Sequence, residues 1–98
     1  MTLPVAFHRA ARAEFIEAAA WYEAKRQDLG VAFIAEIDRC VALAAEQPQL
    51  HAVLHKDVRR VTAEHFPYSV YFRAEAERIV VLAVFHGRRD PAIWRHRA

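Results

Sequence analysis

The stretch IVVLAVFH, residues 79–86, is the most apolar part of the chain and decides how the fold is built. In an extended strand, successive side chains point to opposite faces of the sheet. Apolar residues would then lie on both faces: Ile79, Val81, Ala83 and Phe85 on one, and Val80, Leu82 and Val84 on the other. A strand of this kind is stable only when both of its faces are covered.

Two helices are predicted upstream of this strand. ARAEFIEAAAWYEAKR is rich in alanine and glutamate and has no glycine or proline, which predicts a helix from about Arg9 to Arg26. Apolar residues at helical spacing define the second helix: Phe33, Ile37, Cys40, Val41 and Ala44. Residues 28–30 should form the turn between them, with Gly30 in a turn conformation, and Pro48 should end the second helix. So short a connection predicts an antiparallel hairpin.

The remaining segments read as strands. VAFH (5–8) is short and β-prone, and VRRVTA (58–63), FPYSVYFRA (66–74) and residues 79–86 suit an antiparallel meander. Phe66, Tyr68, Val70 and Phe72 should share one face, whereas residues 49–55 show no clear pattern. We therefore predict one α+β domain over residues 1–98, in the order β-α-α-β-β-β. A helical hairpin packs on one face of a small, mainly antiparallel sheet, and a basic tail follows at the C-terminus.

The predicted hairpin covers only one face of that sheet. The tail or another chain must cover the other face, because an exposed aliphatic face favours association. The last strand therefore indicates a partner.

Composition excludes several classes of protein. Hydrophobic residues make up 55% of the chain, which excludes intrinsic disorder. The single cysteine, Cys40, allows no internal disulfide and fits a reducing compartment. The N-terminal sequence lacks the pattern of a signal peptide, and no apolar run is long enough to span a membrane. We therefore expect a cytoplasmic protein.

The charges are unevenly distributed along the chain. Residues 1–47 hold five Lys/Arg and seven Asp/Glu, a net charge of −2, whereas residues 48–98 hold nine and five, a net charge of +4. Four arginines, two histidines and a tryptophan lie in the last segment, HGRRDPAIWRHRA (86–98). Arginine forms forked contacts with phosphate or carboxylate, so this tail is either a binding surface, a catalytic cluster or a solvated end.

Five segments together resemble the RelE/ParE superfamily of toxins from bacterial type II toxin–antitoxin systems, in its ParE-like (plasmid stabilisation) branch. They are AAAWYEAKRQDLGVAFIAEID (18–38), VRRV (58–61), FPYSVYFR (66–73), IVVLAVFHGRRDP (79–91) and Trp94. Each motif is weak alone, but their order and spacing cover the chain from about Phe7 to Arg97. The order of elements derived above is also that of the family.

The resemblance implies a toxin neutralised by a cognate antitoxin. That partner, ParD-like or other, would have a DNA-binding N-terminal part and a C-terminal segment that folds on the toxin. Neither a membrane nor sequence-specific DNA binding by this chain is implied. Residues expected to contact the antitoxin are Trp21, Arg60, Tyr71, Arg73, Val80, Leu82 and Val84.

Two activities occur in this superfamily, and the sequence favours the first. ParE-like members inhibit DNA gyrase by protein–protein binding and are not enzymes, and the candidate target-binding residues here are Arg88, Arg89, Trp94 and Arg95. Arginine and tryptophan are frequent interface hot spots. The structural alternatives are that Trp94 packs on the sheet and that Arg89 pairs with Asp90 or with a helix carboxylate.

RelE-like members are metal-independent endoribonucleases that cleave mRNA on the ribosome. The corresponding candidates are Arg60, His86 and Arg89, which would provide cations and an acid–base group. The tyrosine that these enzymes carry near the C-terminus is not matched, because the segment reads AIWRHR (92–97). A third possibility is an inactive toxin that only binds its antitoxin. No cofactor or metal is expected for any of these three functions.

Overall fold

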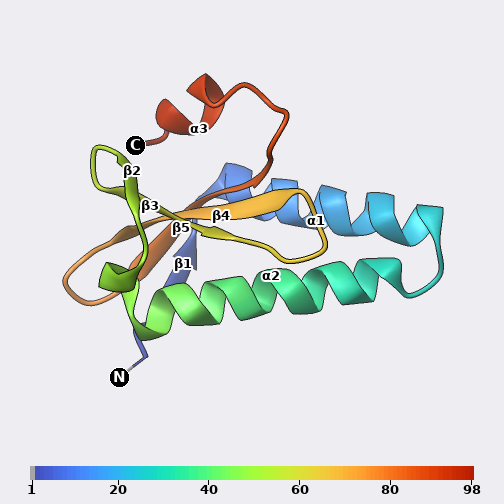
Figure 1. The fold of residues 1–98 in the computed structure, drawn as a ribbon, viewed down its shortest axis with the longest axis horizontal. Helices are drawn as coiled ribbons and strands as arrows, with labels where there is room; N and C mark the ends of the chain where they lie inside the picture. The colour runs from blue at the N-terminus through green and yellow to red at the C-terminus, as the bar shows by residue number, and fades with distance from the viewer. Residues whose placement is uncertain (1) are drawn as a thin grey trace.

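The computed structural model describes residues 2–98 and confirms the predicted α+β fold (Figure 1). Its elements are β1 (Val5–Phe7), α1 (Arg9–Lys25), α2 (Leu29–Glu46), the short 3-10 helix η1 (Pro48–Leu50), β2 (Val53–His55), β3 (Val58–Thr62), β4 (Tyr68–Ala74), β5 (Ile79–His86) and α3 (Ala92–Arg95). The strands form one sheet in the order β1-β5-β4-β3-β2. Only β1 is parallel to its neighbour, and the other pairs are antiparallel.

Strand β2 lies in the segment that shows no pattern in the sequence. It has only three residues at the edge of the sheet, and Val53 and Leu54 remain largely exposed. A strand so short buries too little for apolar alternation to develop, so its sequence carries no signal. No helix within residues 2–98 has the length and hydropathy needed to cross a membrane.

The turn between the helices differs from the expectation. Asp28 adopts the left-handed backbone conformation, with φ 68°, and Gly30 lies inside the first turn of α2. Glycine is required at position 30 because a Cβ atom there would lie 2.6 Å from the carbonyl oxygen of Ala19. The Glu23 carboxylate caps α2 by accepting hydrogen bonds from the backbone N–H groups of Asp28 and Gly30, both at 2.9 Å. The glycine therefore permits close packing of α1 on α2.

The main core lies between the helical hairpin and the sheet. Phe33 of α2 is fully buried at its centre, with ring centroids 5.1 Å from Tyr22, 5.2 Å from Phe66 and 5.0 Å from Tyr68. Val70 and Phe72 belong to the same cluster, which confirms the predicted apolar face of β4. This cluster joins both helices to the sheet.

Strand β5 contains a β-bulge that the sequence did not reveal. Phe72 pairs with Val81 and Tyr71 with Ala83, so Leu82 has no partner on β4. The alternation of side chains between the two faces of the sheet holds up to Leu82 and reverses after it. The predicted faces of the last residues are therefore wrong: Val84 lies with the main core, whereas Ala83 and Phe85 lie on the opposite face.

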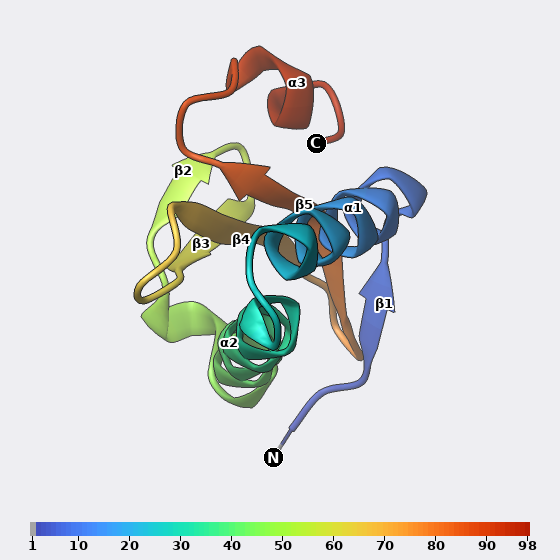
Figure 2. The ribbon, with the colours of Figure 1, turned by 90° about the vertical axis from the view of Figure 1, so that its right-hand side faces the viewer.

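The C-terminal tail covers that second face. Figure 2 shows α3 on the side of the sheet opposite to α2. Trp94 is 3% exposed and stacks on Tyr71 with the ring centroids 4.4 Å apart, above Leu82 and Phe85. Both faces of β5 are thus covered largely by residues of the same chain. The strand therefore does not by itself require the partner that the sequence indicated.

Candidate functional site

The tail leaves β5 through a tight turn whose backbone is held by its own side chains. The Nδ1 atom of His86 accepts a hydrogen bond from the backbone N–H of Arg88 at 3.0 Å. The Asp90 carboxylate accepts one from the N–H of Ala92 at 2.9 Å, at the start of α3. These local bonds give the arginine-bearing segment a defined path rather than that of a loose end.

A carboxylate from α1 joins the tail to the body. Glu14 accepts two hydrogen bonds from the guanidinium of Arg97 and one from that of Arg89, each at 2.9 Å. The side chains of Glu14 and Arg97 are only 11% and 12% exposed. The guanidinium of Arg89 also lies over the ring of Phe85, 4.4 Å from its centroid. The interpretation of Arg89 as the partner of a helix carboxylate is confirmed.

Glu14 and Arg97 were both missed as functional candidates. One signal was present in the sequence, because Glu14 lies three residues after Ala11 and four before Ala18, and both alanines are buried. A carboxylate on the buried face of a helix needs a basic partner. The sequence could not say which of the arginines provides it.

The four predicted target-binding residues separate into two groups. Arg88 and Arg95 are exposed and make no ion pair within residues 2–98, although Arg95 lies over the ring of Trp94. Arg89 is partly neutralised by Glu14, and the Trp94 indole is buried. The alternative in which Trp94 packs on the sheet is therefore confirmed, and its ring is unavailable at the surface.

The three predicted nuclease residues meet in one place. Arg60, His86 and Arg89 line a surface pocket of about 320 Å³ beneath the tail, here called the tail pocket, together with Trp94 and Arg95. Arg60 is exposed and has no acidic partner in the described chain. Because Nδ1 of His86 is already an acceptor, its neutral ring carries the proton on Nε2. In that state Nε2 of His86 can donate a hydrogen bond, and the ring has no free lone pair with which to remove a proton.

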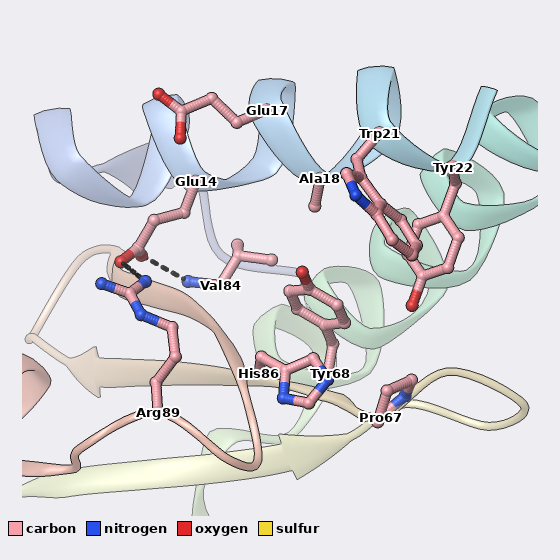
Figure 3. A pocket seen from close by; sticks show the side chains of 10 residues that line it. All are labelled: Glu14, Glu17, Ala18, Trp21, Tyr22, Pro67, Tyr68, Val84, His86 and Arg89. Carbon is pink, nitrogen blue, oxygen red and sulfur yellow. Dashed lines mark hydrogen bonds and ion pairs between the residues drawn. The ribbon is translucent and has the colours of Figure 1, made fainter. Parts of the chain in front are cut away.

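A second pocket, of about 600 Å³, lies between α1 and the end of the sheet (Figure 3) and is here called the α1 pocket. Trp21, Tyr22, Tyr68 and His86 line it, and Arg89 reaches up its side toward Glu14. Burial raises the pKa of both tyrosines, and their proximity raises that of Tyr22 further. Both phenols therefore stay protonated near neutral pH and act as hydrogen-bond donors.

The predicted antitoxin-binding residues do not form one exposed surface. Trp21 is 57% exposed and Arg60 is also exposed, whereas Arg73 is paired with Asp57 at 2.9 Å. Those that lie within the fold, at least in part, are Tyr71, Val80, Leu82 and Val84. Within residues 2–98 no group of three acidic, histidine or cysteine side chains is placed to hold a metal ion.

The fold is a small α+β domain with a basic C-terminal tail, and comparison with known proteins identifies the family. The model of the ParE toxin of the type II toxin–antitoxin system parDE matches residues 5–91. The chain belongs to this family, which implies a cognate antitoxin as its partner. Among solved structures, a chain of the chromosomal ParDE system from P. aeruginosa matches with a TM-score of 0.75 and 19% identity, over 87% of this chain and 96% of that one. The curated proteins searched contain no match.

Proposed function

We propose that this ParE-family toxin acts by binding DNA gyrase and inhibiting it, rather than by catalysis. The observation that carries the proposal is the arrangement of the tail. Arg88 and Arg95 are exposed and unpaired within the described residues, on a segment that Trp94 and Glu14 fix to the body. The backbone that carries these arginines is already ordered, so binding a partner does not have to order it again.

The chemistry of the tail pocket supports binding over cleavage. RNA cleavage without a metal needs a base for the ribose hydroxyl and an uncompensated cation for the phosphate. The hydrogen bond from Arg88 occupies Nδ1 of His86, and Glu14 offsets the charge of Arg89. Of the three nuclease candidates, only Arg60 has a side chain with no hydrogen-bond or ion-pair partner among the described residues.

The second candidate function is ribosome-dependent mRNA cleavage. One observation favours it: Arg60, His86 and Arg89 come from β3, β5 and the turn after β5, yet they line the same pocket. If this function holds, His86 would act as the acid–base group once its hydrogen bond with Arg88 opens, and Arg60 would stabilise the phosphate. His86→Ala should then abolish mRNA cleavage, whereas gyrase inhibition should weaken only as far as the loss of the His86–Arg88 hydrogen bond loosens the turn.

For the antitoxin we propose contacts with the exposed part of the predicted set, Trp21 and Arg60. Trp21 stands beside the α1 pocket, where an apolar side chain of the partner could be received, and Arg60 offers a charge to an acidic one. A large loss of antitoxin affinity is expected for Trp21→Ala, and isothermal titration would measure it. Unchanged affinity in both Trp21→Ala and Arg60→Ala would exclude this surface.

The target surface is tested with two charge-matched variants. Arg88→Ala/Arg95→Ala removes two free arginines from the tail and should raise the concentration needed to inhibit gyrase supercoiling by at least about tenfold. Arg9→Ala/Arg78→Ala removes the same charge elsewhere and should leave inhibition unchanged. Arg89 is left intact because its bond to Glu14 is structural. Equal inhibition by wild type and the tail variant would refute the proposed surface.

A further inference from the structure

Glu14 is joined to the tail by three hydrogen bonds, although it lies within helix α1. Its carboxylate accepts two hydrogen bonds from Arg97. It also accepts one from Arg89 and one, at 3.1 Å, from the backbone N–H of Val84 (Figure 3). Residues 70 to 83 positions further along the sequence are thus joined to α1 through one carboxylate. Such charge-assisted hydrogen bonds are about twice as strong as neutral ones.

The end of β1, next to the β-bulge, leaves backbone groups of β5 for the ion pair to satisfy. Strand β1 pairs with β5 only as far as Val81, so the following residues of β5 have no strand on that side. Glu14 satisfies the N–H of Val84, and Arg97 donates to the carbonyl oxygen of Leu82 at 3.0 Å. The ion pair therefore replaces the missing ladder bonds at the bulge, where unsatisfied backbone groups would destabilise the sheet.

The same contacts hold the tail in place. Arg97 is the second-last residue, and its bond to Glu14 fastens the segment beyond α3, while Trp94 fastens α3 itself. Arg88 and Arg95 both lie on the stretch from the end of β5 to Arg97, Arg88 before Trp94 and Arg95 directly after it. If the end of the tail is released, this stretch gains conformational freedom that a target must remove again on binding.

We propose that Glu14 is a positioning residue, which fastens the tail so that Arg88 and Arg95 are presented in one arrangement to the target. This inference rests on the proposed function of the tail as a target-binding surface. Glu14 itself is not expected to touch the target, because its carboxylate is filled by Arg89, Arg97 and Val84.

The first test measures release of the tail. Glu14→Gln keeps the size of the side chain but removes its charge, and Glu17→Gln makes the same change one turn along on exposed surface. In a Trp21→Phe background, Trp94 fluorescence of Glu14→Gln should shift to the red and become more accessible to acrylamide. Native-state trypsin should cleave in the tail at least about tenfold faster than in wild type, because cleavage follows the population of the open form.

The second test measures activity in the same variants. Glu14→Gln should raise the toxin level needed for growth arrest, and the concentration needed for gyrase inhibition, by at least about fivefold, with Glu17→Gln unchanged. A circular dichroism melt controls for the global fold. Because Glu14 acts through Arg97, the double variant Glu14→Gln/Arg97→Gln should be no weaker than the weaker single variant.

The outcomes separate this inference from the function on which it rests. Growth arrest without gyrase inhibition by wild type would refute the gyrase proposal, while the growth assay would still test Glu14. A tail that stays protected in Glu14→Gln, or a released tail with undiminished growth arrest, would overturn the positioning role. Additive losses in the double variant would overturn it as well. A wild-type protein that arrests no growth would refute both.

Discussion

Replacing Trp94 by alanine should destabilise the fold strongly, although the residue lies only four positions before the last residue, Ala98. The indole is 3% exposed and stacks on Tyr71 with ring centroids 4.4 Å apart. Truncation of a buried tryptophan costs about 3–5 kcal/mol, through lost burial and the cavity that remains. We expect the lower part of this range, because the tail can detach and so limit the loss to the free energy that holds it.

Urea unfolding followed by helical circular dichroism measures this loss. With an m value of about 2 kcal/mol/M, a loss of 3–4 kcal/mol lowers the midpoint by about 1.5–2 M. Trp21→Ala is the matched control, since it removes the same side chain from a position that is 57% exposed. Its loss should stay below about 1 kcal/mol, because alanine is also the better helix former. Equal losses in the two variants, or a loss below about 1 kcal/mol for Trp94→Ala, would refute the view that the tail completes the core.

Three further predictions concern the body of the protein. Gly30→Ala places a Cβ atom 2.6 Å from the carbonyl oxygen of Ala19 and should lower the free energy of unfolding by about 1–3 kcal/mol in the same urea assay. The control is Gly87→Ala, where the nearest atom would be 3.8 Å from the Cβ, and it should change that free energy by less than about 0.5 kcal/mol. Burial, with the nearby Glu36 charge, raises the pKa of the Cys40 thiol to about 11. Iodoacetamide at pH 8 should therefore label Cys40 only after the protein unfolds, and rapid labelling of the native protein would contradict this. Hydrogen bonds from Arg39 lower the pKa of Glu36 from 4.5 to about 2, so its stabilising contribution is present above pH 4.5 and is lost as pH falls toward 2. Melting temperatures of Glu36→Gln should therefore fall less steeply over this range than those of wild type, and parallel curves would refute the assignment.

The fold could be predicted because its signals are local. The spacing of apolar residues on α2 and the shared face of Tyr68, Val70 and Phe72 follow directly from helix and strand periodicity, and the structure bears out both. The bulge at Leu82 could not be predicted in this way, because an inserted residue leaves a uniformly apolar strand looking regular. The faces of the residues after it were wrong for that reason.

The site was only partly predictable, because its key contact joins distant parts of the chain. The sequence indicated a basic tail and a carboxylate partner for Arg89, but it could not pair Glu14 with Arg97, 83 residues away. The role of Trp94 depended on whether α3 folds back over the sheet, which no periodicity encodes. Gly30 was expected in a turn, and only the close approach of α1 to α2 shows its purpose.

The central claim is that this ParE-family toxin inhibits its target by binding through the tail. The most direct measurement uses the purified toxin, free of antitoxin, in two parallel assays: DNA supercoiling by gyrase, and translation of a defined mRNA by purified ribosomes with mapping of the message. We predict loss of supercoiling with an intact message. Cuts in the mRNA together with normal supercoiling would contradict the account and would make Arg60, His86 and Arg89 a catalytic group.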